Sequence, residues 1–296
     1  MSGKRILLVV NPISGGIDKT DIIDFLKDYT QKGDFQLKIF KTNGKNDKAE
    51  LSKIISSFDP NRIFIAGGDG SIKLIAEIIK ENPIPIAIFP AGSANGLAEN
   101  FDLPSSIHEL TEIAFGQNLT SIDSIMVNNE PCLHISDMGL NAELIKNYEE
   151  GNIRGKLGYL IQSIPTLIKS DFPFDFEISV DGKSFSRKAF LVGIANARKF
   201  GTGAIINPNG KVDDGKFEIL VFKKFDIPQI LKTFRENSRL NEDFIEIFSA
   251  EKATVNCSQK VPFQIDGEYR GELNHIKAEI AAQKLIFATP STTLLR

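Results

Sequence analysis

Residues 62–79 read RIFIAGGDGSIKLIAEII, and this stretch decides the fold. After the first arginine come four apolar residues in a row, as in a parallel strand that is covered on both faces. A glycine-rich turn follows. Ile72, Ile75, Ala76 and Ile79 then recur at the i, i+3, i+4 and i+7 positions, which predicts a helix with one apolar face. Strand, glycine turn and helix in this order indicate a βαβ unit.

The same alternation of short apolar runs and helical patterns fills residues 5–120. It predicts strands over 5–10, 36–40, 62–66 and 84–89, and helices from 21 and over 47–58, 71–80 and 94–100. We therefore expect an α/β domain with a parallel sheet at the N-terminal end of the chain.

From about Ser121 the pattern changes to short strands separated by tight turns. The expected turns carry Asn-Asn or Asp-Gly pairs, which readily adopt positive φ, at 128–129, 181–182, 214–215 and 266–267. The expected strands cover 122–127, 131–135, 176–180, 185–195, 216–222 and 261–265. This half is predicted to be a mainly antiparallel β-sandwich-like domain, with helical candidates at 155–169 and 227–237.

The domain boundary follows from this change of pattern. We expect an α/β ATP-binding domain over 1–122, which 284–296 could complete, and a β-rich lipid-substrate domain over 123–283. The apolar run 284–288 reads as a strand that returns to either domain.

Composition excludes several other classes of protein. The formal net charge of -3 gives no general attraction to nucleic acid. Cys132 and Cys257 form no metal-binding pattern, and the apolar run after Arg5 is too short for a signal peptide. No stretch is long and apolar enough to span a bilayer. We expect a cytoplasmic protein that meets membranes only peripherally.

Three of the predicted strands end in loops of small residues, at 11–16, 67–71 and 90–96. In a parallel sheet these loops share the carboxyl edge, where backbone N–H groups favour anions. Glycine allows the backbone to approach phosphate oxygens closely. Asp69 places a carboxylate among three glycines, and two neighbouring anions require a cation, for which Mg²⁺ is the usual choice.

Neither a Walker A pattern nor a complete G-x-G-x-x-G after the first strand is present. Five other motifs are present in order: N-P-x-S-G-G from Asn11, G-G-D-G-S from Gly67, P-x-G-S-x-N from Pro90, N-P-x(5)-D-D-G from Asn207 and Q-x-D-G-E from Gln264. Over nearly its whole length the chain resembles the diacylglycerol-kinase catalytic-domain family, which includes soluble bacterial diacylglycerol kinases, sphingosine and ceramide kinases and, more distantly, NAD kinases.

The resemblance implies an active site in the cleft between the two domains, with specific residues in it. ATP would be held by the loops and by one strand end: Asn11, Pro12, Ser14, Gly15, Gly16, Thr42, Gly67, Gly68, Asp69, Gly70, Ser71, Gly92, Ser93 and Asn95. Asp214 would bind metal, assisted by the backbone carbonyls of Lys211 and Lys216. Glu268 would accept the proton, with Asp266 beside it and Asp69 linked through Mg²⁺.

These roles suit phosphoryl transfer, which needs charge neutralisation and an oriented acceptor. A carboxylate near a lipid hydroxyl can act as a general base. The stretch 154–168, apolar with basic flanks, is a candidate for contact with a bilayer, although a helix packed on its own domain is the simpler interpretation.

Departures from the family pattern leave the acceptor open. Lys73 stands where many bacterial members have Asn, and Gly96 where they have Asp, and the loop at 90–98 looks closer to that of sphingosine kinases.

We expect an ATP- and Mg-dependent lipid kinase acting on diacylglycerol or a related membrane lipid. A sphingoid-base kinase, an NAD kinase and a non-catalytic lipid- or nucleotide-binding regulator are the alternatives. A homodimer is compatible with the sequence.

Overall fold

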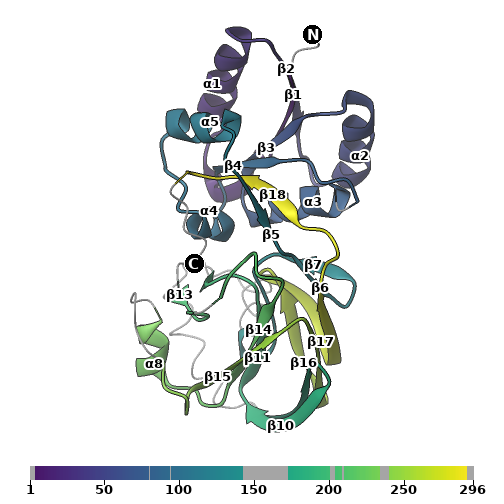
Figure 1. Ribbon diagram of the computed structural model, residues 1–296, viewed down its shortest axis with the longest axis vertical. Helices are drawn as coiled ribbons and strands as arrows, with labels where there is room; N and C mark the ends of the chain where they lie inside the picture. Colours follow the sequence, from purple (N-terminus) through teal and green to yellow (C-terminus); the bar gives the residue numbers. More distant parts are fainter. Residues whose placement is uncertain are drawn as a thin grey trace. The chain divides into compact units, whose positions relative to one another are not determined.

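The computed structural model of the protein describes residues 4–79, 81–93, 95–142, 173–200, 204–208, 210–233 and 240–291. Figure 1 shows the secondary structure of these residues. The chain divides into two compact units. One comprises the residues up to Asp123 together with the segment from Ala282, and the other runs from Ser124 to Ala281.

The first unit is built on a six-stranded sheet in the order β2-β1-β3-β4-β18-β5. Its strands are β1 (Lys4–Val10), β2 (Phe35–Lys41), β3 (Arg62–Gly67), β4 (Ile86–Pro90), β5 (Leu119–Ile122) and β18 (Leu285–Ala288). All neighbours pair in parallel except β5, which is antiparallel to β18. The four strands predicted over 5–89 are present, with bounds that differ by at most two residues.

Helices cover both faces of this sheet (Figure 1). They are α1 (Thr20–Gln31), α2 (Asp47–Phe58), α3 (Asp69–Ile79), α4 (Gly96–Asn100) and α5 (Ile107–Phe115), of which α5 was not predicted. On the face of α1 and α5, Leu8, Phe64 and Phe89 pack with Leu26 and Leu110 in one buried cluster. Continuous apolar runs are needed because each central strand is buried on both sides.

The second unit is a ten-stranded antiparallel sheet system, which confirms the predicted mainly antiparallel β-sandwich-like half. Its path runs β15-β14-β11-β8-β16-β17-β6-β7, and β9 joins β10 to β16. The strands are β6 (Ile125–Val127), β7 (Glu130–Cys132), β8 (Ile135–Gly139), β9 (Phe174–Val180), β10 (Lys183–Ala189), β11 (Leu191–Ala195), β14 (Phe217–Phe222), β15 (Ile245–Ala250), β16 (Lys252–Ile265) and β17 (Glu268–Ile280). A separate short pair, β12 (Lys199–Phe200) and β13 (Ala204–Ile205), completes the described strands.

Three predicted strands were wrong in extent. The run 131–135 spans the end of β7 and the start of β8, which pair with different strands. The run 185–195 is two strands, because the chain breaks at Phe190 so that β10 pairs with β9 while β11 pairs with β8 and β14. The run 122–127 is also divided, since Ile122 ends β5 in the first sheet and Ile125 begins β6 in the second. Of the helical candidates, 155–169 lies outside the described residues, and 227–237 is described as α8 (Ile227–Lys232).

The predicted closing strand returns to the first unit as β18. It lies between β4 and β5, so the first sheet combines strands that precede the second unit in the sequence with one strand that follows it. Phe287 of β18 is fully buried, and its ring centroid lies 5.3 Å from that of Phe101. A buried aromatic residue near the end of the sequence, Phe287, therefore completes the core of the first unit.

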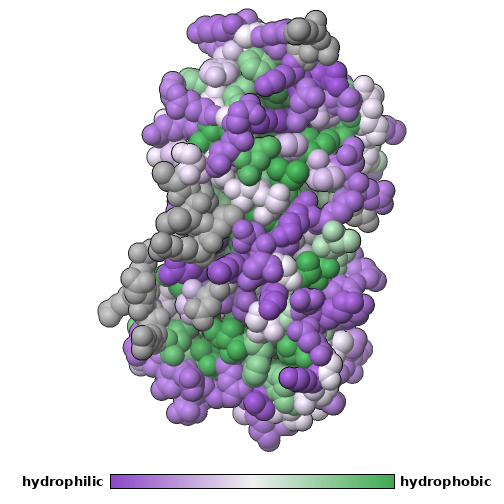
Figure 2. Space-filling model, viewed as in Figure 1, coloured by the Kyte–Doolittle hydropathy of each residue, from purple (hydrophilic) through white to green (hydrophobic). Residues whose placement is uncertain are grey.

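The surface carries scattered apolar areas among hydrophilic residues on the face drawn in Figure 2. Among the described helices, none has the length and hydropathy required to cross a bilayer.

Phe287→Ala should lower the free energy of unfolding by about 3–5 kcal/mol, because it removes a buried ring and leaves a cavity. Leu119→Ala, in the neighbouring strand β5, is the matched control, since Leu119 is 42% exposed and its truncation should cost far less. Urea unfolding of both variants measures the difference. Equal losses would contradict a core completed by β18.

Candidate functional site

The three glycine-rich loops follow the adjacent strands β1, β3 and β4 at their carboxyl ends. Backbone hydrogen bonds continue past the strands into the loops: Asn11 N–H donates to the Ala66 carbonyl oxygen (3.0 Å) and Ala91 N–H to that of Gly67 (2.9 Å). Thr42, at the end of β2, donates its N–H to the Val10 carbonyl oxygen (2.9 Å). The sheet thus brings the predicted nucleotide-binding segments to one edge.

Glycine is required where these loops touch. A Cβ on Gly92 would lie 2.4 Å from the Cα of Gly68, closer than any real side chain allows. Gly15 has a φ of +62°, and a Cβ there would lie 2.8 Å from the Ala91 carbonyl oxygen. The three loops therefore pack backbone against backbone, and the absence of side chains at these contacts leaves the backbone open to close approach by a phosphate.

Side chains fix the third loop in place. Asp69 accepts hydrogen bonds from the N–H of Gly96 (2.9 Å, Oδ2) and of Leu97 (3.4 Å, Oδ1), the first residues of α4. The Asn95 Oδ1 accepts from the N–H of Gly92 (2.9 Å), and the Ser14 hydroxyl donates to the Ala91 carbonyl oxygen (2.8 Å). Asp69 thus has a defined structural task in addition to the metal-linked role that the sequence suggested.

Lys19 holds the first loop and was not singled out from the sequence. Its side chain is only 3% exposed, and its ammonium donates to the carbonyl oxygens of Ser14 and of Ile17 (2.6 Å). Burial lowers the pKa of this amine. A lysine beneath the loop leaves no sequence signal that separates it from a surface lysine, because its burial depends on how the loop folds.

The remaining predicted nucleotide-binding residues differ in exposure. Pro12, Gly16, Gly70 and Ser93 are exposed at the loop edge, as a ligand-binding role requires. The Ser71 side chain is buried instead, and a Cβ on Gly67 would lie 2.5 Å from its hydroxyl. Lys73 and Gly96, which depart from the family pattern, are also buried. Lys73 faces inward on α3, and Gly96 is the buried first residue of α4.

In the second unit the Q-x-D-G-E motif forms the turn between β16 and β17. Gln264 is fully buried, donates through Nε2 to the Oδ2 of Asp137, and accepts the Gly267 N–H at 2.8 Å. Asp137 also accepts from Asn141 Nδ2 (2.6 Å). Burial raises the pKa of Asp137 to about 6, against the hydrogen bonds that lower it. The amide of Gln264 therefore ties the turn to a buried carboxyl group that the sequence did not reveal.

The two acids of this turn have different surroundings. Asp266, with φ of +52°, accepts N–H groups from Leu133 (3.0 Å), His134 (2.9 Å) and Ile135 (3.3 Å). Its carboxylate thus organises the turn before β8, and its predicted part in proton transfer stays a prediction.

Glu268 is exposed and forms an ion pair with Arg270, whose Nε also donates to Glu130 (3.0 Å). Of the two acids, Glu268 is the one whose carboxylate lies at the surface, as a proton acceptor requires.

The predicted metal ligands lie on a different turn of the second unit. Asp214, Lys211 and Lys216 are exposed, and Asp214 accepts the Lys216 N–H (3.1 Å). The motif's Asn207 is fully buried and donates to Glu218 (2.5 Å) on β14.

Burial raises the pKa of Glu218, and the negative charge of Asp214 raises it further. Two neighbouring carboxylates with turn carbonyls offer the oxygen donors that a hard cation prefers. Within the described residues, no three His, Cys, Asp or Glu side chains converge as a metal site.

Comparison with protein families decides the assignment. The family described as "Diacylglycerol kinase catalytic domain" matches residues 5–127, and the "YegS C-terminal NAD kinase beta sandwich-like domain" matches residues 136–287. The chain carries a diacylglycerol kinase catalytic domain followed by a YegS C-terminal domain. This confirms the predicted family and the predicted class of enzyme, a phosphotransferase with an alcohol acceptor.

Relatives of this family member agree over most of its length. It is 24% identical to the "Diacylglycerol kinase" of Bacillus subtilis (strain 168) over 279 residues, 91% of each chain. The crystal structure titled as a diacylglycerol kinase from Bacillus anthracis str. Sterne aligns with a TM-score of 0.76 at 20% identity, covering 99% of this chain and 100% of that one. An NAD kinase from Archaeoglobus fulgidus, in complex with ATP, aligns with a TM-score of 0.55 at 15% identity, covering 98% and 95%. These structures share the fold.

Gly92→Ala should destabilise the first unit by about 1–3 kcal/mol, because the new methyl group must push the third loop away from Gly68. Gly70→Ala is the matched control in the same set of loops, since nothing lies within 4 Å of the Cβ position there. Thermal unfolding of both variants checks the contrast. Full stability of the Gly92 variant would show that the loops are not in contact.

Asp137→Asn should flatten the pH dependence of stability. Because the pKa of Asp137 is raised from 3.8 to about 6, its stabilising contribution is full below pH 3.8 and is lost as pH rises through about 6. Between pH 4.5 and 7.5 the wild-type protein should therefore lose about 2 kcal/mol more than the variant. Urea titrations at both pH values measure this loss, and parallel losses in the two proteins would disprove it.

Proposed function

We propose that the protein is an ATP- and Mg-dependent lipid kinase that phosphorylates the hydroxyl of diacylglycerol or a related membrane lipid. The observation that supports this most directly is the contact of three glycine loops at one edge of a parallel sheet. Such an edge suits the phosphates of a nucleotide. The acceptor lipid would be reached by peripheral contact with a membrane from the cytoplasm.

The chemistry assigns each group a task. The loop N–H groups around Gly68 and Gly92 would hold the phosphates, and Asp214 with the carbonyls of Lys211 and Lys216 would hold Mg²⁺. When bound, the cation would neutralise charge on the transferring phosphoryl group. Glu268 would take the proton of the lipid hydroxyl, a contribution typically worth about 10²–10⁴-fold.

Arg270 contacts the carboxylate that would take this proton. A guanidinium in contact with the Glu268 carboxylate fixes its orientation, which a proton acceptor needs. Glu130 holds the other side of the same guanidinium. Substitution of Glu130 therefore tests the ion pair without touching the proposed base.

The decisive experiment is a screen with labelled ATP, Mg²⁺ and detergent-dispersed diacylglycerol, sphingosine, ceramide and phosphatidylglycerol, with NAD as a separate acceptor. We expect phosphorylation of diacylglycerol. Glu268→Gln should lower kcat by about 10²–10⁴-fold, whereas Glu130→Gln should retain most activity. Asp69→Asn should also be inactive, with its folding checked separately because Asp69 anchors α4.

Three outcomes would overturn the proposal, and a fourth would change the acceptor. Full activity of the Glu268 and Asp69 variants would refute the site. Formation of NADP from NAD, without lipid turnover, would identify an NAD kinase. ATP binding without turnover of any acceptor would indicate a regulator, and a preference for sphingosine would move the acceptor to a sphingoid base.

A further inference from the structure

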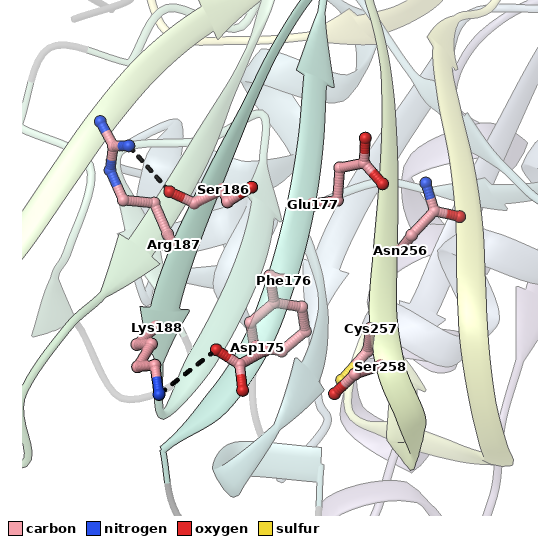
Figure 3. Close-up of a pocket in the computed structure, with 9 residues that line it drawn as sticks. All are labelled: Asp175, Phe176, Glu177, Ser186, Arg187, Lys188, Asn256, Cys257 and Ser258. Carbon is pink, nitrogen blue, oxygen red and sulfur yellow. Dashed lines mark hydrogen bonds and ion pairs between the residues drawn. The ribbon is translucent and has the colours of Figure 1, made fainter.

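Two surface pockets of the described residues lie away from the glycine loops. Figure 3 shows the first, a trough across β9, β10 and β16 in the second unit. Both of its cations are already paired: Lys188 pairs with Asp175 at 3.6 Å, and Arg187 pairs with Glu246 at 2.7 Å. Mixed, neutralised charges between rows of side chains are typical of a solvated sheet face, so this trough indicates no ligand.

The second pocket lies at the amino ends of the first unit's strands and encloses about 420 Å³. Its lining includes the first residues of β1, β2 and β3, namely Lys4, Phe35 and Arg62. Because these strands are parallel, the pocket is at the opposite end of the sheet from the glycine loops. Its volume falls within the range of small-molecule sites, roughly 300–1,000 Å³.

One part of this pocket is apolar. Phe35 and Phe115 meet edge to face with ring centroids 4.7 Å apart, and Ile6 and Pro85 contribute to the same lining. Both rings are only partly buried. A flat or aliphatic group that covered them would gain burial of apolar surface.

The other part is cationic and lacks neutralising charge. The guanidinium of Arg62 donates to two carbonyl oxygens at the end of α5, those of Ala114 and of Gly116 (2.6 Å). No carboxylate in the described part of the chain pairs with Arg62 or with Lys4, whereas Arg5 is paired with Asp59 at 2.6 Å. Burial lowers the pKa of Arg62, as expected for a cation removed from water without an anionic partner.

We propose that this pocket binds a small organic anion, whose carboxylate or phosphate group pairs with Arg62 and Lys4 while its apolar body covers Phe35 and Phe115. Arginine is suited to this task, because its planar fork retains donors beyond those used on the two carbonyl groups. The inference is independent of the lipid kinase activity, since it involves none of the residues assigned to that reaction.

The test titrates the full-length ¹⁵N-labelled chain with phenyl phosphate and with benzoate, which represent the two anionic groups, and follows backbone amide shifts. Phenol and inorganic phosphate are the controls for the apolar body and the anion alone. We expect saturable shifts at residues 4–6, 61–63 and 115–117 with one or both aromatic anions, and none there with the controls at equal concentration.

Variants separate this pocket from other anion sites. Lys4→Gln should weaken binding by about tenfold, which corresponds to loss of one charged hydrogen bond. Lys53→Gln, an exposed lysine on α2 outside the pocket, should leave the affinity unchanged. Arg62→Lys retains the charge but not the fork and should weaken binding similarly. If this variant does not fold, Lys4→Gln alone decides.

Two results would overturn the proposal. One is a set of shifts confined to the glycine loops at residues 67–71 and 92–96, with none at the amino ends of the strands. The other is unchanged affinity in the Lys4→Gln variant.

Discussion

The close approach of the Gly68 and Gly92 backbones is the constraint on which the geometry of the first unit's loops depends. β3 and β4 are hydrogen-bonded neighbours, so the loops that leave them begin about one strand spacing apart, roughly 4.8 Å. Any side chain between them would force them to separate. The carboxylate of Asp69 then fixes the start of α4 at the same place. Sheet pairing, glycine and one acid thus build a single rigid edge.

A comparable principle operates in the second unit, although with polar side chains in place of glycine. Asp137 and Gln264 connect neighbouring strands through buried hydrogen bonds, and Asp266 gathers three N–H groups of another turn. Buried polar groups of this kind stabilise one arrangement, because any alternative leaves them without partners. The turn that presents Glu268 is therefore held from inside the unit.

The sequence predicted much of the fold because its signals are local. The run RIFIA and the apolar spacing behind it specify a buried strand and an amphipathic helix without further context. The prediction of strands from the sequence failed at Phe190 and between Ile122 and Ile125. At both places a continuous apolar run passes from one set of strand partners to another. The periodicity of apolar residues indicates that a residue is buried, but it does not indicate which strand that residue pairs with.

The site shows the same division. Glycine loops and Asp-Gly turns were predicted because their backbone requirements are visible in single residues. The buried states of Lys19 and Asp137 and the half-buried state of Arg62 were not predicted, since burial of a charged side chain is decided by chain segments distant in sequence. Ser71 shows the same limit, because its place in the motif does not indicate that its side chain is buried beside Gly67.

The position of β18 has a consequence for synthesis of the chain on the ribosome. Strands β1 to β4 emerge early, but the strand that covers the side of β4 is made only after the whole second unit. Until then the nascent sheet has an open edge beside apolar residues, a surface that invites pairing with other chains. The first unit is thus translated first, but its sheet is completed only when β18 has been made. Its folding in the cell therefore depends on the second half having left the ribosome.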